Sequence, residues 1–332
     1  MESNVTSPTP LLEVRHLKTH FFTRRGVVKA VNDVSFDVME GETLGLVGES
    51  GSGKTITVMS ILQLLPRGAE ILGGEINFEN ENLLEKTEKE LGAVRGKKIG
   101  LILQNSMTAL DPVFTIGTQI AESLVVHKEM SWKESFKSAI DLLRKVKIGA
   151  PEMRIKRFPH EFSGGMRQRA ASAAAIGPTP ALLVADEPTT ALDVTTQRQY
   201  LQLLQELQAQ TGVTIVFITH DMSIVGSLCD RIAVFYGGIV VEIGPKAEIF
   251  DQPSHPYTKA LLGAIPVLGD KVERLQSVEG EPPNPSNMPD GCPFAPRCDA
   301  AMDKCRTGDP PPVFQLTDAR RVRCWLHEEI HD

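Results

Sequence analysis

The stretch GESGSGKT, from Gly48 to Thr55, has the residue types and the spacing of a loop that binds phosphate. Backbone N–H groups that its three glycines leave accessible can surround phosphate oxygens, and a helix that begins after the loop adds the positive end of its dipole. Lys54 would reach the β- and γ-phosphates, and the Thr55 hydroxyl suits Mg²⁺, which takes oxygen ligands. The alternative is a glycine-rich turn without a ligand. The apolar run TLGLV before the loop and the helical spacing after it favour phosphate binding.

An acidic pair, Asp186 and Glu187, follows a second apolar run, ALLVA. As a buried strand, this run would deliver both carboxylates at its carboxyl end. Asp186 would then join the Mg²⁺ shell, and Glu187 would polarise a water molecule for in-line attack on the γ-phosphate. Adjacent acids at a strand end can also be merely solvated, but the phosphate loop upstream supplies a substrate for them. The two motifs together favour hydrolysis of a nucleoside triphosphate.

Two apolar patterns predict an α/β fold around these motifs. Residues 11–22 and 27–38 alternate apolar and polar side chains, as antiparallel strands with one solvated face do. TLGLV, IGLIL, ALLVAD and TIVFITH are short apolar runs typical of a parallel sheet buried on both faces. A hairpin is predicted around Gly237 and Gly238.

Amphipathic helices are predicted to form an insert between residue 105 and about residue 178. In WKESFKSAIDLLRKV, one face carries Phe136, Ala139, Ile140, Leu143 and Val146. We therefore expect residues 1–250 to form a nucleotide-binding domain with a helical subdomain at about 105–178. Residues 251–332 are rich in proline and weakly periodic, so a small, loop-rich C-terminal domain is expected there.

Charge and hydropathy disfavour two classes of partner or location. The net charge of the 332 residues is -7, which disfavours general attraction to nucleic acid. No apolar run reaches the length of about 18 residues that a membrane-spanning helix needs, and the first residues lack the order of a secretory signal. The chain is expected to stay in the cytoplasm and to reach a membrane only through an embedded partner.

Four of the five cysteines, Cys292, Cys298, Cys305 and Cys324, fall in the predicted C-terminal domain, whereas Cys229 is expected only to pack. In a reducing compartment such a group suggests a metal rather than disulfides. Zinc sites favour paired C-x-x-C knuckles, which are missing here, whereas iron–sulfur clusters accept four thiolates from irregular loops. The cysteine spacing therefore favours an iron–sulfur cluster, with zinc and with unligated or disulfide-forming thiols as the alternatives.

Further motifs make the chain resemble the ATP-binding subunits of ABC transporters. Gln104 matches the glutamine of the Q-loop, TALD ending at Asp193 matches the D-loop, and His220 matches the switch histidine. FSGGMRQR resembles the signature LSGGQ, with Phe162 and Met166 in place of leucine and glutamine. The resemblance implies a RecA-like P-loop ATPase core with an antiparallel β subdomain and the helical insert.

The resemblance also implies a role for each matching residue. The aromatic that stacks on adenine is Phe21, with Phe22 as a rival. The other ATP contacts in the same chain are Gly48, Glu49, Ser50, Gly51, Ser52, Gly53, Lys54, Thr55 and Ile56; the catalytic residues are Lys54, Glu187 and His220; the Mg²⁺ ligands are Thr55, Gln104 and Asp186; and the contacts to ATP held by a facing subunit are Ser163, Gly164, Gly165 and Asp193.

Two cassettes are thus expected to enclose two ATP molecules head to tail. Ser163, Gly164 and Gly165 precede a predicted helix and form a second small anion site of hydroxyl and N–H donors. Because γ-phosphate buried between two chains favours the closed dimer, hydrolysis would release it. The resemblance implies that the dimer binds two transmembrane permease subunits at the cytoplasmic face of the membrane.

The segment HPYT, His255 to Thr258, resembles the C-terminal extension of oligopeptide, dipeptide and nickel importer ATPases. A simple turn is the alternative, because Pro256 interrupts a helix. This branch implies a D-type subunit that drives import of di- or oligopeptides delivered by an extracytoplasmic binding protein. It also implies a second, different cassette as partner and a [4Fe–4S] cluster on the cysteine tail. Nickel or another small solute is the alternative cargo.

Two other functions fit the sequence less well than transport. A soluble ABC ATPase acting on nucleic acid or ribosomes typically carries coiled coils, zinc inserts or tandem cassettes, whereas this chain has one cassette and an acidic balance. An inactive cassette is disfavoured because Lys54, Asp186, Glu187 and His220 are all present.

Overall fold

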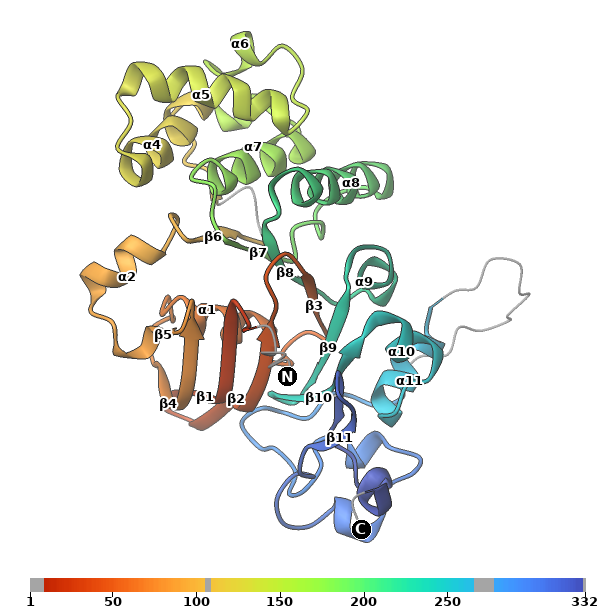
Figure 1. Cartoon of the computed structure of the whole chain (residues 1–332). Coiled ribbons are helices and arrows are strands. Elements are labelled where there is room, and N and C mark those ends of the chain that lie inside the picture. The colour runs from red at the N-terminus through yellow and green to blue at the C-terminus, as the bar shows by residue number, and fades with distance from the viewer. Residues whose placement is uncertain (1–8, 105–108, 266–277, 331–332) are drawn as a thin grey trace, which may run out of the picture. The chain divides into compact units, whose positions relative to one another are not determined.

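The computed structural model describes residues 9–104, 109–265 and 278–330, so the predicted start of the helical insert at residue 105 lies outside the described residues. Contacts divide the chain into two compact units. Unit 1 comprises residues 1–85 and 219–332, and unit 2 comprises residues 86–218. Figure 1 labels the helices and strands of both units.

Unit 1 begins with an antiparallel sheet of four strands in the order β2-β1-β4-β5. The strands are β1 (Leu12–Thr23), β2 (Gly26–Val38), β4 (Ala69–Phe78) and β5 (Glu81–Asn82). Along β1 the side chains of Leu12, Val14 and Leu17 are buried, while the residues between them are more exposed. The alternation in the sequence thus predicted both long strands and their single buried face.

A second set of strands in unit 1 frames the phosphate loop. The parallel pair β3 (Thr43–Val47) and β9 (Arg231–Tyr236) is followed by β10 (Ile239–Pro245), which turns back antiparallel to β9. The predicted hairpin at Gly237 and Gly238 is therefore confirmed. The helices of this unit are α1 (Lys54–Ile61), α9 (Met222–Leu228), α10 (Lys246–Asp251) and α11 (Pro256–Gly263), with a 3₁₀ turn η1 (Leu83–Glu85).

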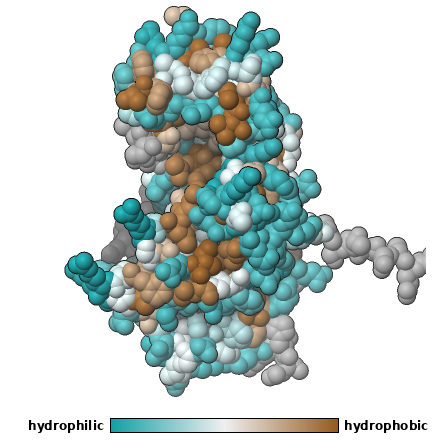
Figure 2. Space-filling model, turned by 90° about the vertical axis from the view of Figure 1, so that its left-hand side faces the viewer, coloured by the Kyte–Doolittle hydropathy of each residue, from teal (hydrophilic) through white to brown (hydrophobic). Residues whose placement is uncertain are grey.

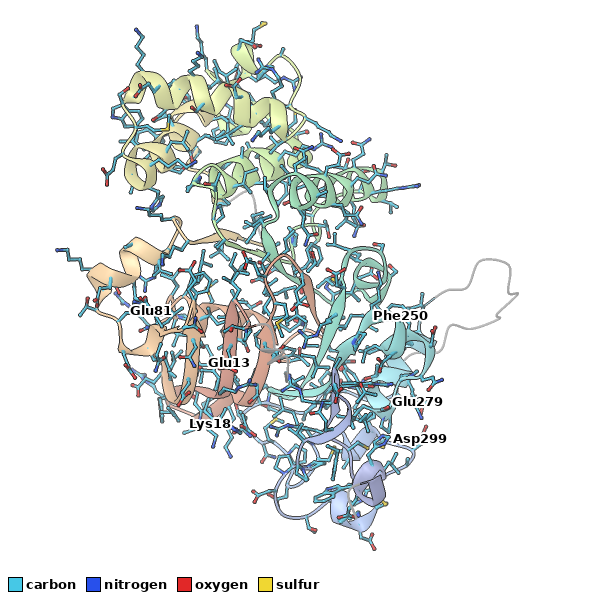
Figure 3. All side chains as sticks on the ribbon, viewed as in Figure 1. Glu13, Lys18, Glu81, Phe250, Glu279 and Asp299 are labelled. Atoms are coloured by element: carbon cyan, nitrogen blue, oxygen red, sulfur yellow. The ribbon has the colours of Figure 1, made fainter. Side chains whose placement is uncertain are left out.

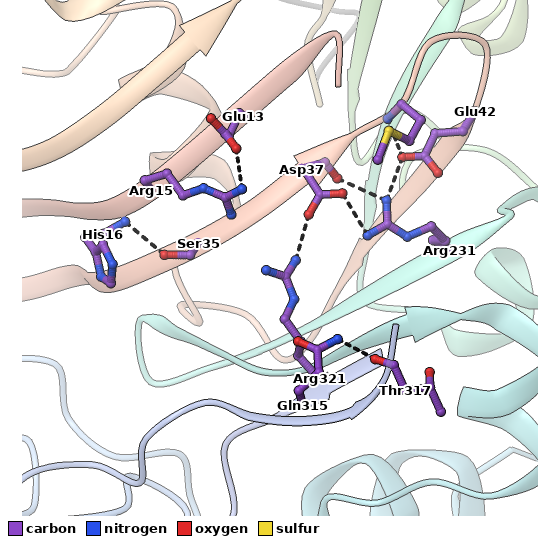
Figure 4. Close-up of polar contacts among 11 residues, drawn as sticks. Glu13, Arg15, His16, Ser35, Asp37, Glu42, Arg231, Gln315, Thr317 and Arg321 are labelled. Carbon is purple, nitrogen blue, oxygen red and sulfur yellow. Dashed lines mark hydrogen bonds and ion pairs between the residues drawn. The ribbon is translucent and has the colours of Figure 1, made fainter. Parts of the chain in front are cut away.

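The C-terminal extension adds a hairpin that the sequence did not reveal. Its strands β11 (Phe314–Thr317) and β12 (Arg320–Val322) pair with each other, and β12 also pairs with β10. Three 3₁₀ turns accompany them, η3 (Ala295–Arg297), η4 (Asp303–Cys305) and η5 (Trp325–Ile330). Figure 4 shows Asp37 of β2 between Arg231 and Arg321, at 3.1 and 2.7 Å. One carboxylate of the first sheet therefore holds both β9 and the added hairpin.

A buried ion pair fixes the extension to β10. The Glu242 side chain is fully buried, and its carboxylate accepts hydrogen bonds from Arg320 at 2.7 Å and from the backbone N–H groups of Ser254 and His255, each at 2.9 Å. His255 is the N-cap of α11, where its Nδ1 accepts from the Tyr257 N–H at 3.0 Å. HPYT therefore begins a helix, and Pro256 occupies the first turn, where no N–H is needed.

Acid is expected to weaken this part of the fold. Burial, with a smaller effect of His327, lowers the pKa of His255 from 6.5 to about 3. Because the unfolded chain then binds a proton that the folded chain excludes, the stabilisation present above pH 6.5 is lost as the pH falls toward 3. His255→Asn keeps a capping acceptor without the titration. Between about pH 6.5 and pH 5, the wild type should lose roughly 2 kcal/mol more free energy of unfolding than this variant, measured by denaturant titration.

The control is His160→Asn at an exposed position, which should keep the wild-type pH dependence. Equal losses in the wild type and in His255→Asn would show that His255 takes up its proton without unfolding.

Unit 2 combines a parallel sheet with helices. Its strands β6 (Ile99–Ile102), β7 (Leu182–Asp186) and β8 (Thr214–Thr219) run parallel, in the order β6-β7-β8, and β8 ends at the unit boundary. All residues of β7 and β8 are buried, as the continuous apolar runs predicted. The α/β class is thus confirmed.

The helices of unit 2 include the predicted amphipathic one. They are α2 (Glu88–Val94), α4 (Ile116–Lys128), α5 (Trp132–Lys145), α6 (Pro151–Arg154), α7 (Gly164–Ile176) and α8 (Val194–Thr211), with a 3₁₀ turn η2 (Pro159–Glu161). In α5 the predicted apolar face buries Ala139 and Leu143 completely. Apolar side chains also reach the surface over the helices at the top of Figure 2. Within the described ranges, no helix is long and apolar enough to cross a membrane.

Candidate functional site

The phosphate loop of unit 1 connects β3 to α1 and depends on glycine at two points. Gly53, the N-cap of α1, has φ 104°, and a Cβ there would lie 2.5 Å from the Ala30 carbonyl oxygen. A Cβ on Gly48 would collide with the carbonyl oxygen of Phe235. Only glycine allows the backbone this close approach, so the sequence motif and the packing require the same residue.

The Lys54 side chain lies inside this loop rather than in solvent. It is 4% exposed, and its ammonium donates to the carbonyl oxygens of Gly48 and Glu49, at 2.7 and 2.9 Å, and to the Ser52 hydroxyl at 3.2 Å. The loop therefore forms a collar around one cation at the start of a helix. A positive charge next to the positive end of a helix dipole is an arrangement suited to an anion.

The other residues predicted to contact ATP in unit 1 differ in exposure. Thr55 and Ile56 are half-buried in the first turn of α1, and Ser50 and Gly51 are exposed. Phe21 is half-buried in β1, whereas Phe22 is 48% exposed. Phe22 thus has the more accessible ring, and the assignment of adenine stacking to Phe21 stays a prediction. His220 follows β8 and is exposed.

The acidic pair lies in unit 2 at the end of β7, as predicted. Asp186 is 2% exposed, and Glu187 directly follows the strand with φ 41°. This left-handed conformation costs about 1 kcal/mol or more for a residue with a side chain, and such strain is concentrated at functional sites. The Glu187 N–H donates to the carbonyl oxygen of Ile218 at 3.0 Å, which fixes the strained residue to the neighbouring strand.

Gln104 and Glu187, 83 positions apart in sequence, come together in unit 2. The Gln104 amide Nε2 donates to Glu187 Oε2 at 2.9 Å, and the Thr190 hydroxyl donates to the same oxygen at 3.0 Å. Thr190 is the first residue of the TALD motif, but the motif did not indicate that its hydroxyl binds Glu187. Two donors on one oxygen fix the orientation of the carboxylate, as a base that must position a water molecule requires.

The oxygen donors predicted for Mg²⁺ are of the right chemical kind. The Thr55 hydroxyl, the Gln104 amide and the Asp186 carboxylate are hard ligands of the type that Mg²⁺ takes beside phosphate oxygens and water. Thr55 belongs to unit 1, and Gln104 and Asp186 belong to unit 2. Their joint role as ligands stays a prediction.

The signature segment forms a helix start in unit 2. Ser163 is the N-cap of α7, and its hydroxyl accepts from the Met166 N–H at 3.3 Å. A Cβ on Gly165 would collide with the Thr196 side chain, so the first turn of α7 has no room for a larger residue. Phe162 is 5% exposed and belongs to the hydrophobic core. The Met166 sulfur accepts a hydrogen bond from the Arg154 guanidinium at 3.4 Å. Both departures from LSGGQ are thus accommodated within the unit.

Asp193, predicted to contact ATP in a facing subunit, is the N-cap of α8. Its carboxylate accepts from the Thr196 N–H at 3.0 Å and from the Thr196 hydroxyl at 2.7 Å, and these hydrogen bonds lower its pKa. Aspartate is a preferred N-cap residue, so the sequence also indicated a helix start at Asp193, in addition to the one predicted after Ser163.

The predicted iron–sulfur cluster is wrong, and so is its zinc alternative. Over the described part of the chain, no group of three or more His, Cys, Asp or Glu side chains could hold a metal ion. Cys292, Cys298, Cys305 and Cys324 are free cysteines. Burial raises the pKa of Cys292 to about 11 and also raises the pKa of Cys298 and Cys324, which favours thiols over the thiolates that metals bind.

The cysteines serve packing instead. The Cys292 N–H donates to the Cys305 carbonyl oxygen at 2.8 Å, which joins two turns of the extension. Cys324 packs with Phe314 and Val322 of the added hairpin.

Comparison with known proteins agrees with this geometry. A family model described as "ABC transporter" matches residues 31–190, and one described as "Oligopeptide/dipeptide transporter, C-terminal region" matches residues 241–305. The oligopeptide transport ATP-binding protein AppD of Bacillus subtilis is 46% identical over 96% of this chain and 97% of its own length. The dipeptide transport ATP-binding protein DppD of the same organism is 45% identical over 96% of this chain and 95% of its own length.

Solved structures of similar chains are ATP-binding cassettes. A dimeric cassette in a post-hydrolysis state, bound to ADP and phosphate, is 28% identical, has a TM-score of 0.64 and covers 71% of this chain and 98% of its own. The fold is therefore the predicted RecA-like P-loop ATPase core with its antiparallel sheet, helical part and small C-terminal extension. The phosphate loop, the acidic strand end and these relatives together place the chain in the family of ABC transporter ATP-binding proteins with an oligopeptide/dipeptide transporter C-terminal region.

Proposed function

We propose that this chain is the energy-coupling ATPase subunit of an ABC importer for dipeptides or oligopeptides. The observation that carries the proposal is the collar around Lys54, a cation held at a helix start inside a glycine loop. Relatives described as oligopeptide and dipeptide transport ATP-binding proteins, aligned over nearly the whole chain, support the choice of cargo. Nickel or another small solute is the alternative cargo, because the solute is recognised by other subunits.

In the proposed reaction, Lys54 and the loop N–H groups hold the β- and γ-phosphates of ATP. Thr55, Gln104 and Asp186 would hold Mg²⁺, and the ion would supply positive charge that stabilises the phosphoryl group during its transfer. Glu187 orients a water molecule and accepts its proton while the water oxygen bonds to the γ-phosphorus and the bond to ADP breaks. His220 donates a hydrogen bond to the γ-phosphate and thereby distinguishes ATP from its products.

The proposed active assembly contains two cassettes. Ser163, Gly164, Gly165 and Asp193 of each would close over the nucleotide of the other, so that ATP favours the closed dimer and hydrolysis reopens it. We propose that the second cassette is a different, homologous chain, and that the pair binds two permease subunits at the cytoplasmic face of the membrane. An extracytoplasmic binding protein would deliver the peptide.

The test is an ATPase measurement on the chain purified with its co-encoded membrane and cassette subunits in lipid nanodiscs. The co-encoded binding protein is added with dipeptides, with longer peptides or with nickel. Stimulation of hydrolysis by peptides supports the proposal. Stimulation by nickel alone would show that the importer carries nickel instead of peptides. The Glu187→Gln assembly is the control for contaminating ATPases. If no solute stimulates a robust basal ATPase, the import function is rejected while the hydrolytic function stands.

A further inference from the structure

The phosphate loop contains an acid, Glu49, directly after Gly48. A carboxylate in a loop that binds a triphosphate adds a like charge to the site, which weakens binding unless a cation neutralises it. Its side chain is 26% exposed, so solvent screens the charge only in part. The partner of Glu49 therefore affects how well the loop can hold an anion.

That partner comes from the C-terminal extension. Arg297 at the end of η3 is 4% exposed, and its guanidinium grips the Glu49 carboxylate with two parallel hydrogen bonds of 2.7 and 3.0 Å. This two-pronged geometry is the strong form of an arginine–carboxylate pair, and lysine cannot reproduce it. The ion pair joins residues 248 positions apart.

Arg297 is itself held rigidly by its surroundings. Its remaining N–H groups donate to the Tyr236 hydroxyl at 3.2 Å and to the carbonyl oxygens of Val278 and Glu279 at 3.1 and 2.7 Å. All five N–H donors of the guanidinium thus have acceptors. Glu279 and Asp299, labelled in Figure 3, mark the two stretches of the extension that meet at Arg297.

The extension also holds the backbone of Glu49. The Glu49 N–H donates to the hydroxyl of Tyr257, a fully buried residue of α11, at 3.0 Å. Tyr257 packs against Tyr236 and Phe294, with ring centroids 4.5 and 5.3 Å apart. Burial raises the pKa of Tyr257, so the phenol stays neutral and adds no second negative charge to the loop.

We infer that Arg297 is a positioning residue for the phosphate loop: it neutralises Glu49 and fixes the loop, and through it the C-terminal extension sets the affinity of the cassette for ATP. This inference rests on the proposed ATPase function, because it assigns a role to the extension at the same loop. The extension is thereby part of the nucleotide site, although it contains none of the motifs by which that site was found.

The test compares binding of a fluorescent ATP analogue to the full chain and to Arg297→Gln. The unpaired Glu49 charge should weaken binding by roughly tenfold at low salt. The loss should shrink when the salt is raised from about 50 mM to about 0.5 M, because ions screen exposed charges. The double variant Arg297→Gln with Glu49→Gln, which has no unpaired charge, should recover most of the affinity. A purely structural role of Arg297 predicts neither the salt effect nor the recovery.

The matched control is Arg306→Gln, an exposed arginine of the same extension, which should bind as the wild type does. Wild-type affinity in Arg297→Gln overturns the inference, and so does a loss that persists in the double variant and at high salt. If Arg297→Gln does not fold, Glu49→Gln takes its place: ATP binding as tight as in the wild type or tighter supports neutralisation of the Glu49 charge as the role of Arg297, and a roughly tenfold loss overturns the inference. Absence of ATP binding by the wild type would instead contradict the proposed function.

Discussion

Glu187→Gln is expected to lower the rate of ATP hydrolysis by a factor of about 10² to 10⁴, the usual contribution of a general base. Glutamine has the shape of glutamate, and its amide oxygen can still accept from the Thr190 hydroxyl, which lies 3.0 Å from Glu187 Oε2. The strained backbone at φ 41° is unchanged by the substitution. What disappears is the acceptor for the proton of the attacking water, so ATP should remain bound and the closed dimer should accumulate.

Phosphate release under single-turnover conditions measures the rate, and size-exclusion chromatography of the chain together with its partner cassette in ATP measures the dimer. Glu206→Gln is the matched control, because Glu206 is an acid of unit 2 that pairs with Lys147 at 2.6 Å. It should hydrolyse ATP at the wild-type rate. Turnover that persists in Glu187→Gln would assign the base to another residue.

Lys54→Ala is expected to weaken ATP binding by roughly 100-fold, because the substitution removes charge-assisted hydrogen bonds to phosphate. The structure adds a second cause. The ammonium holds the carbonyl oxygens of Gly48 and Glu49 around itself, so its loss also loosens the loop before any ligand arrives. Both effects act on affinity, which isothermal titration calorimetry measures directly.

Lys18→Ala, an exposed position on β1 that is labelled in Figure 3, is the control and should bind ATP normally. Unchanged affinity in Lys54→Ala would contradict the assignment of the loop as the phosphate site. Lost affinity with an unchanged melting temperature would show that the direct contact to phosphate outweighs the effect on the loop.

Local patterns predicted local structure well. Side chains that face the core repeat with the period of the element that carries them, so residues near one another in sequence predict the element. Examples are the period-two alternation of β1 and β2, the continuous apolar runs of β7 and β8, and the helical face of α5. The left-handed backbone at Gly53 is local in the same sense, because the residue that adopts this conformation is itself the glycine that the motif requires.

Contacts between residues far apart in the sequence could not be predicted from it. No residue next to Glu49 in the sequence indicates that Arg297 binds it. Likewise, no residue next to Gln104 indicates that its amide donates a hydrogen bond to Glu187. The cysteine error has the same origin. Spacing along the chain reports which residues are close in sequence, whereas a metal site depends on the direction of each side chain and on thiols that can lose a proton, and burial disfavours that loss at Cys292.

The C-terminal extension also limits how this cassette can evolve. Strand β12 pairs with β10, and Arg320 supplies the charge that opposes the fully buried Glu242 carboxylate. A descendant that lost the extension would expose the edge of β10 and leave Glu242 and Glu49 without their arginines in a single step. Several compensating substitutions would have to arise beforehand. We therefore expect selection to retain the extension wherever Glu242 and Glu49 are both present.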